Sequence, residues 1–121
     1  MSDKANRNAA LYLADMLQAA REIREFTLVE QSVFLADRMR QRAVIQCFEV
    51  IGEATKKLPT ELREANPDLS WRYMAAFRDK LIHDYFEIDL QLVWATAQQE
   101  IPKLIPQLET IARQFGQDAN P

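Results

Sequence analysis

The chain has few of the residues that make tight turns or covalent crosslinks. Its 121 residues include 2 glycines and 5 prolines, which argues against a turn-rich all-β protein, because each tight connection needs such residues. The single cysteine, Cys47, excludes an intramolecular disulfide and has no companions for a zinc site. With 48% hydrophobic and 27% charged residues, the composition is typical of one helical globular domain.

Long apolar runs and an excess of positive charge are also missing. No apolar run reaches about 18 residues and the start, MSDKANRNAA, is polar, so we expect no membrane span, no secretory signal and a cytoplasmic location. The formal net charge of -3 argues against a general nucleic-acid coat protein, which binds through a broad basic face. A small basic cleft is compatible with this charge, and Arg72 and Lys80 beside Arg78 are its candidate nucleic-acid-binding residues.

Apolar residues recur at spacings of three and four along most of the chain, a pattern that predicts amphipathic helices. The expected helices span 9–26, 27–35, 37–58, 71 to just before Tyr85, and 90–115, with one or two further turns over 60–65. The sequence therefore predicts a single all-α domain over residues 1–121, an antiparallel bundle of about five helices. Residues 1–6 and 116–121 are expected to be loose termini.

Polar side chains at the expected helix ends support these boundaries. Thr27 and Glu30 have the spacing of a capping box, in which a hydroxyl and a carboxylate satisfy free backbone N–H groups at the start of a helix. Asp37, Ser70 and Asp89 each precede a predicted helix and are expected to cap it.

Glycine and proline predict two further features. Gly52 lies inside a predicted helix, where it costs on the order of 1 kcal/mol relative to alanine, so we expect a neighbouring backbone to approach closely there. Pro59 should end that helix. Pro102 and Pro106 each remove a helical hydrogen bond, which predicts a kink or break around residues 100–106.

The densest polar chemistry lies in residues 71–89, where Arg78, Asp79, His83 and Tyr85 fall within eight consecutive positions. Asp79 and His83 stand four apart, so on a helix the carboxylate could orient the imidazole. Arg78 and His83 lie roughly 140° apart around a helix, so they meet in one cleft only through the length of Arg78, a helix distortion or a second chain. From the residues alone, a lone histidine near a helix end more often caps carbonyls or fills a core edge, and both roles stay open.

The segment RDKLIHDY carries an R-x4-H-x-Y pattern, formed by Arg78, His83 and Tyr85. Together with the blocks at 15–26, 50–59 and 67–94, in this order, it resembles the HepT-like toxins, a branch of the HEPN ribonuclease superfamily. The resemblance covers most of the chain. It implies a HEPN-like helical bundle that forms a homodimer.

The resemblance also implies a metal-independent endoribonuclease whose active site is shared between the two chains and needs no cofactor. In that scheme His83 moves protons, Arg78 holds the phosphate and Asp79 orients either of them. Many family members have asparagine after the motif arginine, where this chain has Asp79. A carboxylate there favours protonated His83 and competes for Arg78, so the departure bears on the efficiency of cleavage.

A regulatory partner is implied by the same family. In HepT-like toxin–antitoxin systems a minimal nucleotidyltransferase (MNT-type) antitoxin transfers AMP to the motif tyrosine, here Tyr85, and so blocks RNA. From the residues alone, Tyr85 could instead anchor the chain as it leaves the helix. Two other hypotheses for the whole chain stay open: a catalytically silent helical adaptor or nucleotide-binding partner of such a nucleotidyltransferase, and a plain dimeric helical bundle.

Overall fold

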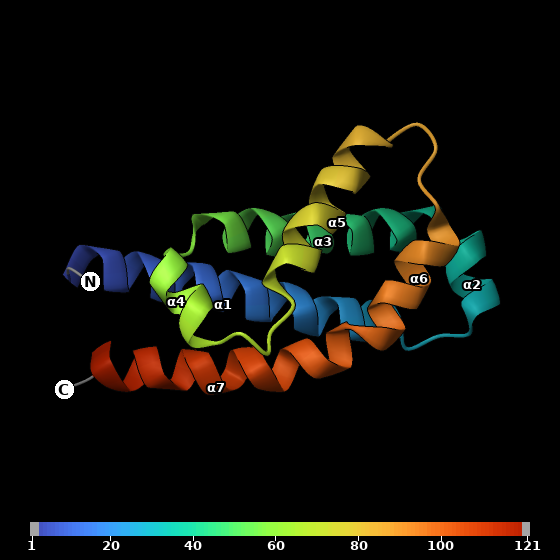
Figure 1. Ribbon diagram of the computed structural model, residues 1–121. Helices are drawn as coiled ribbons and strands as arrows, with labels where there is room; N and C mark the ends of the chain where they lie inside the picture. Colours follow the sequence, from blue (N-terminus) through green and yellow to red (C-terminus); the bar gives the residue numbers. More distant parts are fainter. Residues whose placement is uncertain (1–2, 120–121) are drawn as a thin grey trace.

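The computed structural model of the protein describes residues 3–119, which form helices and no strands (Figure 1). The helices are α1 Asp3–Phe26, α2 Gln31–Ala36, α3 Arg38–Lys57, α4 Thr60–Ala65, α5 Trp71–His83, α6 Leu90–Gln99 and α7 Ile101–Ala119. The all-α prediction is confirmed. Seven helices replace the expected five because residues 60–65 form a defined helix and the expected last helix is divided in two. No helix within 3–119 has both the length and the apolar composition to cross a membrane.

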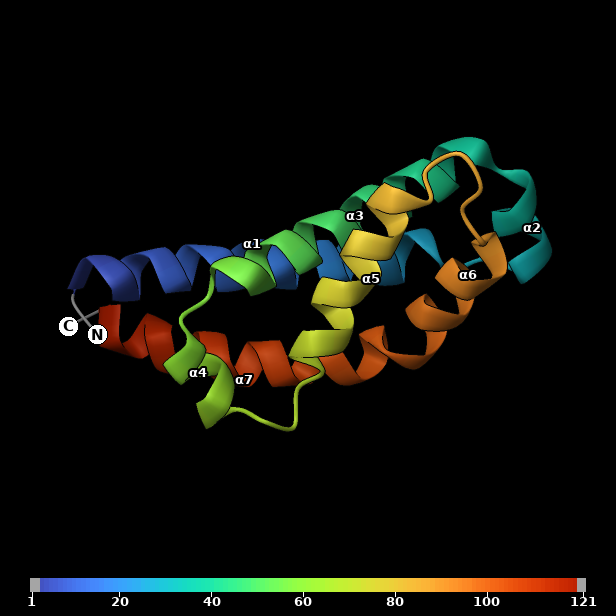
Figure 2. The ribbon, with the colours of Figure 1, turned by 45° about the horizontal axis from the view of Figure 1, so that its top comes forward.

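Three long helices form the body of the bundle. Helix α1 packs against both α3 and α7 and runs antiparallel to each, so the start of α1 and the end of α7 lie at the same end (Figures 1 and 2). The apolar stripes of these helices meet in one core. Its largest fully buried side chains are Phe34, Phe48, Leu13, Met16, Ile23, Ile51, Met74, Ile101, Leu104, Leu108, Val44 and Val93. Burying each such side chain contributes roughly 1.5–3 kcal/mol, so the stripes hold the bundle together.

Helix α5 crosses this body steeply and packs against α3 (Figures 1 and 2). The predicted stripe of Met74, Phe77 and Leu81 is buried, and Trp71 is buried with it. The ring of Phe77 meets that of Phe48 on α3 edge to face, with ring centroids 5.0 Å apart. Because this stripe faces the core, the polar residues between its members lie along the edge of the helix.

Two of the three single-residue caps form as predicted. The side chain of Asp37 accepts a hydrogen bond from the Arg40 N–H at 3.1 Å, and that of Asp89 accepts one from the Leu92 N–H at 3.1 Å. The predicted Ser70 cap is wrong, because no side-chain bond forms there. Ser70 has ψ of 58°, whereas the two aspartates have the extended backbone from which a cap reaches the first turn.

The predicted capping box at Thr27 and Glu30 is also wrong. The Thr27 hydroxyl donates to the carbonyl of Ile23 at 2.7 Å and so closes the end of α1 instead of starting α2. Helix α2 begins after Glu30 without a side-chain cap. A threonine at a helix end can satisfy either a free N–H or a free carbonyl, and here the carbonyl one turn earlier is nearer.

The predicted break near residue 100 is confirmed. Helix α6 ends at Gln99, α7 begins at Ile101, and the two helices contact each other. Pro102 falls in the first turn of α7, where a backbone N–H has no partner within the helix, while Pro106 lies inside the helix. Helix α7 therefore packs against α1 as a helix separate from α6.

The described helices extend further toward both chain ends than predicted. Helix α1 begins at Asp3 and α7 continues through Ala119, so residues 3–6 and 116–119 are helical where loose termini were expected. Residues 1, 2, 120 and 121, for which the same expectation was made, lie outside the described residues.

Candidate functional site

The predicted site residues lie along the edge of α5 and in the connection after it. Arg78 is partly buried, whereas Asp79 and His83 are exposed. Tyr85 lies just past the end of α5, as predicted, in the connection of residues 84–89. The end of α5 and this connection project from the long helices in Figure 1. The motif is therefore presented outward from the bundle.

Gly52 of α3 lies directly beneath Arg78 of α5. A methyl group added at Gly52 would overlap the Cβ of Arg78 and lie 2.8 Å from its Cγ and 2.9 Å from the carbonyl oxygen of Met74. These separations are shorter than carbon and oxygen atoms normally adopt. The predicted close approach at Gly52 is confirmed, and it presses the stem of Arg78 against α3.

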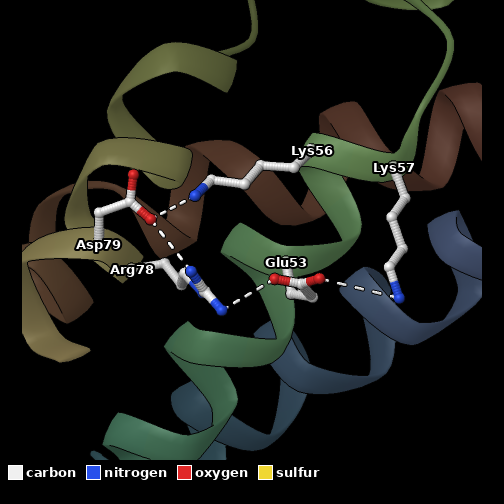
Figure 3. Close-up of polar contacts among 5 residues, drawn as sticks. All are labelled: Glu53, Lys56, Lys57, Arg78 and Asp79. Atoms are coloured by element: carbon white, nitrogen blue, oxygen red, sulfur yellow. Dashed lines mark hydrogen bonds and ion pairs between the residues drawn. The ribbon is translucent and has the colours of Figure 1, made fainter.

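A chain of alternating charges joins α3 to α5 around Arg78 (Figure 3). One terminal nitrogen of Arg78 forms an ion pair with Glu53 at 3.0 Å, and the other donates to Asp79 at 3.1 Å. Lys56 binds the same oxygen of Asp79. The second oxygen of Glu53 lies 3.8 Å from Lys57. Arg78 is thus held between one carboxylate from each helix.

These two carboxylates do not saturate Arg78. A guanidinium has five N–H donors. Its Nε is buried and has no hydrogen-bond partner among the described residues, while the side chain as a whole is 27% exposed. The terminal nitrogens are therefore the atoms through which Arg78 can hold a phosphate.

Asp79 contacts Arg78 and Lys56. Hydrogen bonds from Lys56 and then from Arg78 hold the pKa of Asp79 below its ordinary value. Within residues 3–119 no hydrogen bond or ion pair joins Asp79 to His83, although the two stand one helical turn apart. Of the two partners that the sequence left open for Asp79, the structure brings it to Arg78.

His83 and Arg78 line different hollows. His83 lies with Asp84, Phe86 and Glu87 around a hollow of about 360 Å³. Arg78 lines a separate groove of about 320 Å³ formed by α1, α3 and α5. These two hollows thus lie on different sides of α5, in agreement with the wide separation of Arg78 and His83 around the helix.

Asp84 follows His83 directly and forms an ion pair with Lys80. It accepts a hydrogen bond from Lys80 at 2.8 Å, which lowers the pKa of Asp84, and the nearby charge of His83 lowers it further. The same hydrogen bond raises the pKa of Lys80. Lys80 is thus occupied by an ion pair, whereas Arg72, on the first turn of α5, is exposed without a polar partner in the described structure. Of the two predicted RNA-binding cations, only Arg72 has no ion-pair or hydrogen-bond partner within residues 3–119.

Three exposed apolar side chains lie within three residues of His83 in the sequence. Ile82 is 42% exposed, Tyr85 65% and Phe86 85%, and the rings of Tyr85 and Phe86 lie 4.1 Å apart. Single exposed apolar residues are ordinary, but several gathered in residues 82–86 form a patch of the kind found at interfaces. We call residues 82–86 the α5-end patch.

Three charged neighbours of the motif were given no role from the sequence, and of these only Glu53 was expected as a possible polar neighbour of the site. Glu53 had a signal, since it follows the glycine at which a close approach was expected. Asp84 follows His83 directly. Lys56 had none, because its contact with Asp79 depends on how α3 and α5 are aligned. No group of three or more His, Cys, Asp or Glu in residues 3–119 is placed to bind a metal ion.

The helical bundle and the motif at the end of α5 together define a HEPN-like domain. The chain belongs to the HepT-like ribonuclease family, since the family model described as "Ribonuclease HepT-like" matches residues 16–111. A protein of Thermococcus cleftensis named "Probable ribonuclease HepT" is 41% identical over 103 residues, which cover 84% of this chain and 94% of that one. A Methanocaldococcus jannaschii protein named "Putative RNase MJ1216" is 40% identical over 116 residues, covering 94% and 96%. No solved structure matches the chain significantly.

Proposed function

We propose that this protein is the ribonuclease toxin of a toxin–antitoxin pair. It cleaves RNA without a metal ion at a site shared between two copies of the chain, and a nucleotidyltransferase antitoxin neutralises it by adding AMP to Tyr85. The observation that carries the proposal is the placement of the motif: Arg78 and His83 are both accessible, yet they line separate hollows of one chain. Relatives named as ribonucleases support RNA as the substrate.

RNA cleavage of this kind has three requirements. The ribose 2′-hydroxyl loses its proton, an anionic phosphorane is stabilised, and the leaving 5′-oxygen is protonated. His83 moves the protons, and the terminal nitrogens of Arg78 hold the phosphate oxygens. Asp79 orients Arg78 through its hydrogen bond. One chain has a single histidine and so only one such acid or base, whereas a two-fold dimer supplies two.

The α5-end patch supports the shared site. Its apolar side chains, Ile82, Tyr85 and Phe86, lie within three residues of His83 in the sequence and are exposed in one chain. A two-fold axis near this patch buries those side chains against their copies and brings the two histidines to one phosphodiester. The same contact therefore stabilises the dimer and completes the site.

The position of Tyr85 is compatible with the proposed inactivation by AMP transfer. Its phenol is exposed and stands two residues after His83. In AMP transfer the phenol oxygen attacks the α-phosphorus of ATP, pyrophosphate leaves, and the phenol proton passes to a base of the nucleotidyltransferase. The product carries a phosphodiester anion next to His83, where it takes the place of the substrate phosphate.

Cleavage of cellular RNA by the purified protein in the presence of EDTA tests the activity. Arg78→Ala and His83→Ala should each abolish cleavage and leave the helical circular dichroism unchanged, because neither side chain lies in the core. Arg21→Ala is the matched control, since Arg21 also pairs with a carboxylate of another helix, Glu109, at 3.0 Å. Undiminished cleavage by His83→Ala refutes the assignment. A parent protein that binds the nucleotidyltransferase but leaves RNA intact favours the silent adaptor.

Mixed dimers test whether the site is shared. Parent and His83→Ala chains are refolded together at varied ratios, and cleavage is measured at constant total protein. If each site needs both histidines, the rate follows the square of the parent fraction, because only parent–parent dimers act. A rate that is linear in the parent fraction shows that each chain acts alone and removes the shared site.

Intact mass spectrometry with the partner nucleotidyltransferase and ATP tests the modification. The parent should gain one AMP and lose cleavage, whereas Tyr85→Phe should remain folded and unmodified. Tyr73→Phe is the control, because Tyr73 is also exposed and lies on α5 but is bonded to Thr96. An AMP adduct that persists in Tyr85→Phe contradicts the assignment.

A further inference from the structure

We infer that Glu53, on α3, is a positioning residue that aims Arg78 at the substrate phosphate. The inference rests on the proposed ribonuclease function and adds to it a residue outside the R-x4-H-x-Y motif. Its basis is the ion pair at 3.0 Å between Glu53 and Arg78, which crosses from α3 to α5 (Figure 3).

Arg78 is fixed to α3 at two points. Its Cβ and Cγ rest on Gly52, where even a methyl group has no room, and its terminal nitrogen is held by the next residue, Glu53. An unrestrained arginine loses rotamer entropy when it binds an anion. Holding the stem and the head before substrate arrives removes much of that loss, so the guanidinium is already directed when RNA binds.

Asp79 cannot hold Arg78 in the same way. It neighbours Arg78 on α5, its side chain is 54% exposed, and it is tied to α3 only through the long side chain of Lys56. Glu53 is anchored in a different helix and is less exposed, at 44%. Glu53 is therefore the carboxylate that ties the guanidinium of Arg78 directly to α3.

The five residues of the ion-pair cluster carry a net positive charge, although Asp15 and Glu49 also line the groove of Arg78. Three cations, Lys56, Lys57 and Arg78, face two carboxylates, Glu53 and Asp79, which leaves one net positive charge. Each carboxylate is shared between Arg78 and a lysine. A phosphate oxygen that reaches the terminal nitrogens of Arg78 thus meets a positively charged group that is already in place.

Steady-state cleavage of a defined RNA by the full-length protein tests this role. Glu53→Ala should lower kcat/KM by on the order of tenfold to a hundredfold, because a misplaced catalytic group loses rate without loss of fold. Glu53→Gln should lose less, because its amide oxygen still accepts from Arg78. Glu109→Ala, which breaks the equally short Arg21 pair, should keep the parent kcat/KM. If Glu53→Ala cleaves as fast as the parent or faster, the positioning role is wrong.

Nuclear magnetic resonance of the ¹⁵N-labelled arginine side chains separates this inference from the proposed function. In the parent, rotation of the Arg78 guanidinium should be slowed by its two carboxylates, with the signal assigned by its loss in Arg78→Ala. Glu53→Ala should speed that rotation, and Glu109→Ala should leave it unchanged. If the parent cleaves no RNA, the proposed function fails while this measurement still decides the positioning. An Arg78 signal that is the same in Glu53→Ala and parent overturns the inference.

Discussion

Replacing Gly52 by alanine tests the contact on which the site is built. In a free helix the change stabilises by about 1 kcal/mol. Here the new methyl group meets Arg78 Cβ and Cγ and the Met74 carbonyl. A change of the Arg78 rotamer moves Cγ but leaves Cβ and the Met74 carbonyl in place, because the backbone of α5 fixes both of them. Overpacking of this kind costs about 3 kcal/mol at the upper end of the usual range. The expected net loss is therefore about 2 kcal/mol, produced by moving α5 away from α3.

Thermal unfolding followed by circular dichroism measures this loss. For a domain of this size each kcal/mol shifts Tm by roughly 3–4 °C, so Gly52→Ala should lower Tm by about 7 °C. Gln46→Ala, an exposed change on α3, should shift Tm by less than about 2 °C. RNA cleavage should fall in Gly52→Ala as well, because the stem of Arg78 is displaced. A Tm equal to or above that of the parent shows that α5 does not press on Gly52 and refutes the packing argument.

Three further results are expected. Because the folded-state pKa of Asp79 is lowered, its contribution to stability is present above pH 3.8 and is lost as the pH falls through the lowered pKa. The Tm difference between parent and Asp79→Asn should therefore shrink as the solution is acidified below pH 3.8, and a difference that stays constant there contradicts this. Burial raises the pKa of Cys47 to about 11, so a thiol reagent near neutral pH should label it only after unfolding, and rapid labelling of folded protein would contradict its burial. Phe86→Ser should weaken self-association in light scattering without lowering Tm; an unchanged mass places the dimer contact elsewhere.

The core of the fold could be predicted from the sequence because its signal is local. On α3 the spacing of Val44, Phe48, Ile51 and Thr55 fixes which face is buried, and all four are buried in the structure. Gly52 lies on the same helix, and its cost there indicated a close neighbour without saying which one. The structure supplies the identity: the neighbour is the motif helix α5.

The parts that could not be predicted depend on alignment between elements. The Lys56 contact with Asp79 and the Glu53 contact with Arg78 both require α5 to cross α3 at one register, and periodicity within each helix leaves that register open. At Thr27 the difficulty was chemical, since a hydroxyl both donates and accepts and can serve either end of a helix.

The arrangement of the chain ends has a consequence for how this domain can be joined to others. The start of α1 and the end of α7 lie together at one end of the bundle, while the α5-end patch projects elsewhere (Figure 1). A second domain fused through a linker at either terminus therefore adds its mass away from residues 82–86. Affinity tags, fluorescent proteins or tethers to a surface attached at either terminus should thus leave the α5-end patch open, so the proposed pairing through it can be tested with labels in place.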